Sequence, residues 1–269
     1  MTLFTALASC GAGKGRKGAQ GVGGGGAPFP CVNSLGGGSK ENSRMEKRQK
    51  PDKGNAAFQE FEREFLAALG RDFKTPALDR FNRSLVQRGA DVSFLKDAVL
   101  EKQEYHRTYF QVSLARRKDA RAQFAFLEEN FDLLQDWWHV DQLTQFLHRP
   151  TLEFALAKAA EYRQDPRPYV RRWAYVLFIP ALLKEPGATE ALLPLFQDDK
   201  AYTVQMAEAW LLSFLAVQQP EAVFAFLKDA RLDYAIAGKA IQKICDSFRI
   251  PQEWKARFKS LRPALKLLP

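Results

Sequence analysis

The residues best suited to chemistry in this chain begin with a tryptophan and an aspartate four positions apart, Trp137 and Asp141. On a helix this spacing places both side chains on one face, one turn apart. A large π surface beside a carboxylate can hold a cation and stabilise positive charge. The same pair also fits a core tryptophan with a capping or salt-bridged aspartate, so both interpretations stay open. The adjacent Trp138 is more simply a core residue.

Two arginines, Arg171 and Arg172, open a predicted helix whose next turns, residues 173–183, are almost wholly apolar. Because arginine is rarely buried without a partner, we expect both guanidinium groups to point outwards, at the rim or the concave side. Arg172 there suits a phosphate. The alternative is a solvated helix end.

A third helix carries Tyr202, Gln205, Met206 and Trp210, with the tyrosine, methionine and tryptophan on successive turns of one face. An aromatic stripe of this kind is either part of the core or one wall of a groove. The place of Trp210 in the repeat, next to the helix of Arg172, favours the groove wall.

Other catalytic chemistry finds little support. The three histidines, His106, His139 and His148, lack the spacing of metal ligands, and no cysteine pair supplies any. Cys245 has no activating histidine nearby, and no Gly-x-Ser-x-Gly motif is present. We therefore expect neither a metal nor another cofactor.

Helical periodicity begins at Ala56 and continues through the rest of the chain. Phe58, Phe61 and Phe65, with Leu66 and Leu69, follow an amphipathic pattern of about 100° per residue. Prolines at 166, 168, 220 and 251 stand where new helices would begin. No credible strand pattern occurs, so the sequence predicts an all-α fold.

These helices follow a repeat register, with a period of about 33 residues that is typical of stacked helix pairs. The segment 165–174 lies over 198–207, and the register extends back to 136–141 and forward to 234–244. Repeats of this kind stack into an α-α superhelix, a solenoid with one concave surface. Equivalent helices would then bring Asp141, Arg172, Gln205 and Trp210 to one side of a groove.

Residues 1–54 differ from the remainder of the chain in composition. They hold 13 of the 17 glycines and carry 9 Lys/Arg against 3 Asp/Glu, whereas residues 55–269 carry 31 against 28. We interpret 1–54 as a disordered, Gly-rich basic tail and 55–269 as the HEAT-like helical-repeat domain. Met45 heads a basic run that leads into the first helix and is a candidate start, in which case residues 1–44 are not translated.

The chain has no segment suited to a membrane. Its longest apolar run, 173–183, is interrupted by Pro180 and falls well short of the roughly 20 residues that a transmembrane helix needs. Three cysteines, two of them in the tail, cannot make a disulfide framework and fit a reducing compartment.

Three motifs together resemble the AlkD-like DNA alkylation repair glycosylases, a family built of HEAT-like helical repeats. They are Trp137-Trp-His-Val-Asp141, Tyr169-Val-Arg-Arg172-Trp-Ala174 and Tyr202-Thr-Val-Gln205-Met-Ala-Glu-Ala-Trp210. The resemblance runs from about Phe124 to Arg262, roughly half the chain.

The resemblance implies a role for each matching residue. Asp141 would be the catalytic carboxylate, Trp137 and Trp210 aromatic walls against the lesion, and Arg172 a contact to the DNA backbone. Tyr202 and Gln205 would bind substrate or DNA beside them.

The implied protein is a monomeric, cytoplasmic, nucleoid-associated glycosylase. It would excise cationic purines of the 3-methyladenine and 7-methylguanine type from double-stranded DNA by N-glycosidic hydrolysis in the concave groove, without a metal or cofactor.

A non-catalytic HEAT-like module that binds nucleic acid or protein is the alternative. It is favoured by Ser213, where the family pattern has an arginine three residues after the tryptophan, and by residues 56–120, which show little of the family's sequence. The intact Trp137, Asp141, Arg172 and Trp210 favour the enzyme.

Overall fold

The computed structural model describes residues 55–70, 74–229 and 232–267, all within one compact unit, residues 47–269. The described residues form helices and turns and contain no strand, which confirms the all-α prediction. The predicted tail, residues 1–54, lies outside the described residues.

Twelve α-helices and four 3₁₀ helices (η) follow one another along this described part. Their bounds are α1 Ala56–Leu69, α2 Thr75–Gln87, η1 Ser93–Asp97, α3 Gln103–Ala115, α4 Ala120–Glu128, η2 Phe131–Leu133, α5 Trp137–Asp141, η3 Leu143–Gln145, α6 Leu152–Tyr162, α7 Pro168–Val176, α8 Ala188–Leu192, η4 Leu193–Leu195, α9 Tyr202–Gln218, α10 Pro220–Asp229, α11 Tyr234–Asp246 and α12 Gln252–Leu265.

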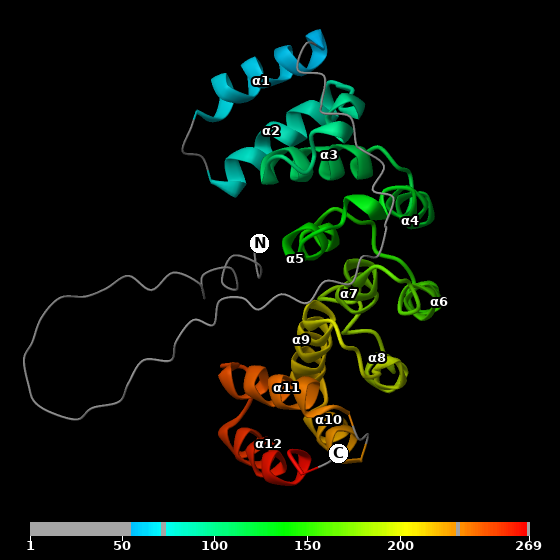
Figure 1. Ribbon diagram of the computed structural model, residues 1–269, viewed down its shortest axis with the longest axis vertical. Coiled ribbons are helices and arrows are strands. Elements are labelled where there is room, and N and C mark those ends of the chain that lie inside the picture. Colours follow the sequence, from blue (N-terminus) through cyan, green and yellow to red (C-terminus); the bar gives the residue numbers. More distant parts are fainter. Residues whose placement is uncertain (1–54, 71–73, 230–231, 268–269) are drawn as a thin grey trace, which may run out of the picture. The chain divides into compact units, whose positions relative to one another are not determined.

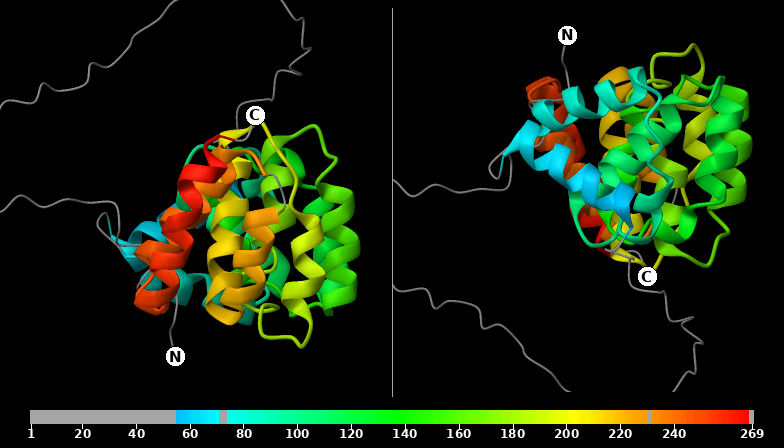
Figure 2. Two further views of the ribbon diagram at one scale, coloured as in Figure 1. Left: turned by 90° about the horizontal axis from the view of Figure 1, so that it is seen from below. Right: turned by 90° about the horizontal axis from the view of Figure 1, so that it is seen from above.

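The helices stack as a two-layered array. One layer contains α5, α7, α9 and α11, which pack on one another in that order. Helices α6, α8 and α10 form the second layer, and α12 packs on α10 and α11 at the carboxyl end (Figure 1). Seen from its two ends, the helices of the array run side by side (Figure 2). Each segment of the repeat register therefore contributes the first-layer helix of one repeat.

Local sequence signals set where these helices begin. Pro168 and Pro220 occupy first helical positions, and Pro251 precedes α12. Proline suits these places because the first N–H groups of a helix have no partner within it. Asp136 and Asp233 cap α5 and α11, since each carboxylate accepts a bond from a backbone N–H of its helix. The predicted role of proline is thus confirmed at three helix starts.

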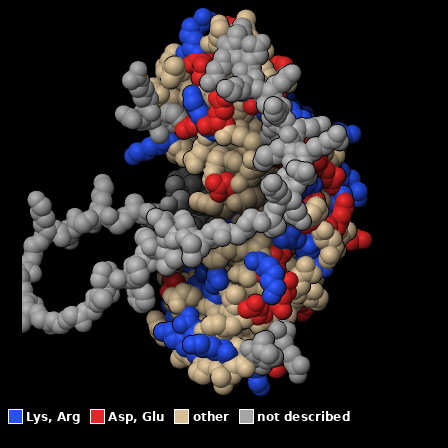
Figure 3. Space-filling model, viewed as in Figure 1, with Lys and Arg blue, Asp and Glu red and all other residues tan. Residues whose placement is uncertain are grey.

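Charged side chains of both signs are interspersed over much of one face of the array (Figure 3). Lysine and arginine predominate near the turn that joins α11 to α12.

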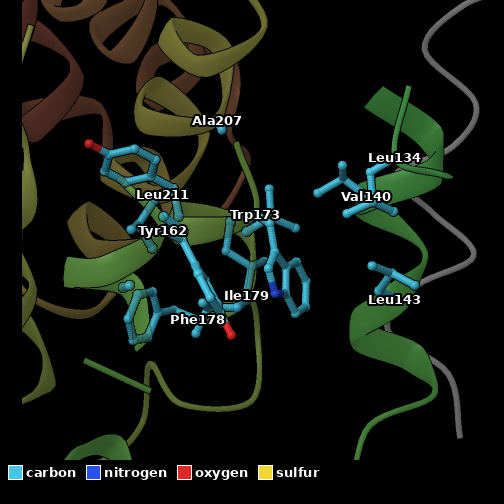
Figure 4. Close-up of a cluster of buried hydrophobic side chains, with 14 of the residues drawn as sticks. Leu134, Val140, Leu143, Tyr162, Trp173, Phe178, Ile179, Ala207 and Leu211 are labelled. Carbon is cyan, nitrogen blue, oxygen red and sulfur yellow. The ribbon is translucent and has the colours of Figure 1, made fainter. Parts of the chain in front are cut away.

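The core between the layers fixes the position of α5. Val140 and Leu143 are fully buried and point toward Trp173 of α7, which is itself fully buried (Figure 4). Burying one such side chain stabilises the fold by roughly 1.5–3 kcal/mol. The short helix α5 is therefore held in register by Val140 and by Leu143 of the following η3, whereas Trp137 at its start is exposed.

Candidate active site

The centre of the candidate site is an ion pair between α5 and α7. The Arg172 Nε donates to Asp141 Oδ1 at 2.9 Å, and its Nη2 donates to Asp141 Oδ2 at 2.8 Å. The third donor, Nη1, bonds the carbonyl oxygen of Thr203 in the first turn of α9 at 2.6 Å. This fork holds a carboxylate and three successive first-layer helices in one geometry.

Arg172 is buried, with 5% of its surface exposed, whereas we predicted an outward-pointing guanidinium. The physical reason is that each of its three nitrogens has an acceptor, and a paired arginine is stable in the interior. Asp141 keeps more exposure, and the side chain remains 18% accessible. Solvent, or a ligand, therefore reaches this pair through the carboxylate.

Burial raises the pKa of Asp141 above its ordinary value, and the charge and hydrogen bonds of Arg172 oppose the shift. Lys243 of α11 also lowers the pKa of Asp141, while Asp136 raises it. Burial and the nearby Arg172 cation in turn lower the pKa of Lys243. The carboxylate thus sits in a partly dry position next to two cationic side chains.

Trp137 is 58% exposed, so it is not the core tryptophan of the alternative interpretation. The main-chain N–H of Trp137 donates to Asp136 Oδ1 at 2.6 Å, which fixes the start of α5. Trp138 is partly buried and packs edge-on against the imidazole of His106, at 5.2 Å between ring centroids. The two neighbouring tryptophans therefore point in opposite directions. Trp138 points into the protein, and Trp137 points to solvent on the same helix as Asp141.

Two stacked imidazoles join α3 and α5. The rings of His106 and His139 are 3.9 Å apart and nearly parallel, at 6°. Burial lowers the pKa of His139 to about 4 and that of His106 well below its ordinary value. Both rings are therefore neutral at pH 7, and the pair joins α5 to α3 without adding a positive charge there.

The remaining predicted residues lie on α9. Tyr202 is 68% exposed and stands beside Lys239, whose Nζ is 5.3 Å from the ring centroid. Trp210 is partly buried against the core and contacts Phe214, at 5.9 Å between ring centroids. Tyr202 thus presents an accessible aromatic surface, and Trp210 a partial one.

Gln205 is buried, and its side-chain amide donates to the carbonyl oxygen of Asp199 at 2.8 Å. Ser213 is buried as well, and its hydroxyl donates to the Trp210 carbonyl oxygen of its own helix at 2.7 Å. Both side chains are largely covered, and the role of Gln205 in binding substrate or DNA stays a prediction. Each satisfies a backbone carbonyl.

Two lysines of α11, Lys239 and Lys243, belong to this site, although the sequence analysis missed them. They are four residues apart and so share a face of the helix, toward Tyr202 and toward the Asp141–Arg172 pair. The repeat register, which brings α11 beside α9, carried the signal that could have found them.

No group of three or more His, Cys, Asp or Glu residues that could hold a metal ion occurs among the residues described. Likewise, no helix in that part of the chain is long and apolar enough to cross a membrane.

The chain belongs to the DNA alkylation repair enzyme family, whose family model matches residues 43–244. The match includes residues 56–120, in which we found little of the family's sequence, and it ends before α12. It contains the whole candidate site, from Trp137 to Lys243. No curated protein and no solved structure was found to match the chain.

Proposed function

We propose that this member of the DNA alkylation repair enzyme family is a monofunctional DNA N-glycosylase. It releases cationic alkylated purines, of the 3-methyladenine and 7-methylguanine type, from duplex DNA by hydrolysis of the N-glycosidic bond. The observation that carries this proposal is a partly accessible carboxylate, Asp141, held rigidly beside an exposed indole, Trp137.

The chemistry needs few groups. An N3- or N7-alkylated purine already carries a positive charge and leaves without protonation by a general acid, unlike the leaving group of a glycosidase. What remains is to stabilise the oxocarbenium-like sugar and to admit water. A fixed carboxylate in a partly dry site supplies that stabilisation electrostatically.

Trp137 is suited to the base itself. Its exposed indole lies on the helix that carries Asp141, and a cationic purine gains about 0.5–2 kcal/mol from cation–π attraction to such a ring. Tyr202 offers a second accessible ring from α9, and Trp210 a partly covered one. These rings would distinguish a cationic base from a neutral one.

Arg172 acts on Asp141 in this scheme and does not contact a phosphate. Its two bonds to the carboxylate fix both oxygens and favour the ionised form, in opposition to burial. It is therefore a positioning residue. Lys239 and Lys243, at the edge of the site, take the role of phosphate contacts.

A non-catalytic module that binds nucleic acid or protein is the second candidate, and one observation favours it. Both oxygens of Asp141 are bonded to Arg172, as they would be if the pair only joined two repeats. A test must therefore separate loss of chemistry from loss of the pair.

The chain contains a matched control for this test, a second forked pair between Arg107 and Asp79. Arg107 Nε bonds Asp79 Oδ1 at 2.8 Å and Nη2 bonds Asp79 Oδ2 at 3.1 Å, with side chains 10% and 23% exposed. Asp141→Asn and Asp79→Asn thus remove the same charge from the same geometry at two places.

The experiment measures release of free base from duplex DNA that contains 7-methylguanine, at equal concentrations of folded protein. We expect Asp141→Asn to reduce the rate about 10²- to 10³-fold, and Asp79→Asn to leave the rate of the folded fraction unchanged. Equal rates for the two variants would reject Asp141 as the catalytic carboxylate. No release by the unaltered protein would favour the binding module.

A further inference from the structure

The turn between α11 and α12 exposes an aromatic side chain that the candidate site does not use. Phe248 is 88% exposed, the highest value among the large apolar side chains of the described residues. It lies two residues after the end of α11 at Asp246 and beyond the family match, which ends at residue 244. A phenyl ring held in water on a short turn is available to a partner.

This turn lies next to the wall of the candidate site. The guanidinium carbon of Arg249 is 4.8 Å from the ring centroid of Phe214, which in turn contacts Trp210. Lys243 lies in the last turn of α11, five residues before Phe248. A ligand that fills the site and extends along α11 would therefore reach Phe248 next.

Four cations close to Phe248 in the sequence form no ion pair among the described residues, although the charges of Asp141 and Asp246 act on one of them, Lys243. Lys243, Arg249, Lys255 and Lys259 take part in none of the ion pairs among the described residues. Lysine and arginine gather on the surface over this turn (Figure 3). Asp246, the nearest carboxylate in sequence, accepts a hydrogen bond from Gln242. An exposed ring within unpaired positive charge fits a polyanion that has apolar surfaces between its charges.

We propose that this turn is a second contact to duplex DNA, in which Phe248 packs into the minor groove and Arg249 and its neighbouring lysines bind phosphates. The inference rests on the proposed function, which places DNA in the adjacent groove. Phosphate contacts supply affinity and fix the register of a protein on the duplex. An apolar side chain that wedges into the minor groove opens base steps and bends the helix.

The first test is the affinity of the full chain for undamaged duplex DNA, measured by fluorescence anisotropy. Phe248→Ala should weaken binding about tenfold, because a ring that stacks on bases contributes at this scale. Leu66→Ala is the matched control, since Leu66 is also exposed, at 55%, and lies on α1 at the other end of the array. Neither variant should change the melting temperature, because neither side chain is packed.

The second test is the salt dependence of the same binding. Arg249→Gln should lower the slope of log Kd against log salt by about one. Lys96→Gln on η1, an exposed lysine far along the chain, should not change it. Duplexes labelled at both ends should bend less with Phe248→Ala than with the unaltered protein.

The outcomes separate this inference from the proposed function. If Phe248→Ala and Arg249→Gln bind undamaged duplex as the unaltered protein does, the turn is not a DNA contact, whatever the rate of base release. If they bind more weakly but release base normally at saturating protein, the turn holds DNA without taking part in the chemistry. Loss of binding to anionic vesicles, with DNA binding retained, would assign the turn to a lipid surface and overturn the proposal.

Discussion

The arginines in the middle of the array and the cations at its carboxyl end differ in what they contact. Arg107, Arg171 and Arg172 each bond a carboxylate through two nitrogens, and their partners are Asp79, Asp199 and Asp141. Lys243, Arg249, Lys255 and Lys259 form no ion pair with any described residue. The first group is neutralised inside the protein, whereas Arg249 and Lys259 of the second group are exposed to solvent and Lys243 and Lys255 are partly buried.

This contrast teaches that net charge says little about which surface binds an anion. Residues 55–269 carry nearly equal numbers of cations and anions. The paired arginines bond carboxylates 28, 28 and 31 residues away, close to one repeat. The pairs therefore join successive repeats, and the excess positive charge is left where the array ends.

The largest expected effect comes from breaking one of the central pairs. Arg172→Ala leaves Asp141 buried without its partner and should lower the free energy of unfolding by about 3–5 kcal/mol. Lys255→Ala, at the carboxyl end, should change it by no more than about 0.5 kcal/mol. Urea denaturation at pH 7 measures both.

A double variant provides the control for this prediction. Arg172→Gln combined with Asp141→Asn removes both charges and should recover part of the lost stability. Equal stabilities for Arg172→Ala and Lys255→Ala would show that the central pairs do not differ from surface charges, and the comparison would fail.

Much of the fold could be predicted from the sequence because its signals are local or periodic. Proline and capping aspartates mark helix starts, and the repeat register identified the first-layer helices α5, α7, α9 and α11. The same register brought Asp141 and Arg172 to one place. Their role in catalysis stays a prediction.

The partners of charged side chains could not be predicted. The outward orientation expected for Arg172 was wrong. Helical periodicity predicts which face of a helix a residue lies on, but it does not predict that a carboxylate one repeat away, Asp141, accepts hydrogen bonds from it. Leu66, placed on the apolar face of α1, is half exposed, since that helix packs mainly through Phe58, Phe61 and Phe65. Lys243 and Phe248 carry no motif, and tertiary packing alone gives them neighbours.

Glu208 also lies in the middle of the array, but unlike the three arginines there it forms no ion pair among the described residues. It is fully buried, and burial raises its pKa to about 8, although bonds from Tyr175 and the Gln197 main chain oppose the shift. The folded protein therefore holds this proton more tightly than the unfolded chain does. Stability from this group is complete below pH 4.5 and is lost as the pH rises through 8.

Glu208→Gln should accordingly flatten the loss of stability toward alkaline pH, by up to about 1.4 kcal/mol per pH unit between pH 4.5 and 8. Denaturation at several pH values measures the slope. An unaltered slope would mean that Glu208 is ionised inside the protein, with a cation that compensates it.

His139, one of the two stacked histidines, should act in the opposite direction and to a smaller extent. Burial lowers the pKa of His139 to about 4, so as the pH decreases the unfolded chain is protonated at this histidine before the folded protein is. Stability should fall as the pH decreases from 6.5 through 4. His139→Asn should reduce the number of protons taken up on unfolding between these pH values by about one. The slope of melting temperature against pH measures this change. A variant with the same acid dependence would show that His139 is charged in the folded protein.

The smallest expected effect is on the salt dependence of DNA binding. It compares one paired cation from the middle of the array with one unpaired cation from its carboxyl end. Arg171 is bonded to Asp199 at 2.7 and 3.2 Å, so its charge is already compensated before DNA approaches. Lys259 on α12 is exposed and has no carboxylate partner among the described residues. Each phosphate contact contributes about one unit to the slope of log Kd against log salt, because one counterion is released.

We therefore expect Lys259→Gln to lower this slope by up to about one and Arg171→Gln to leave it unchanged, although the second variant removes a charge from the same chain and weakens the fold. Anisotropy titrations over a range of KCl concentrations, with protein shown to be folded at each one, distinguish the two. If Arg171→Gln lowers the slope as Lys259→Gln does, pairing within the protein does not decide which cations contact DNA. The net charge of the protein would then explain the salt dependence equally well.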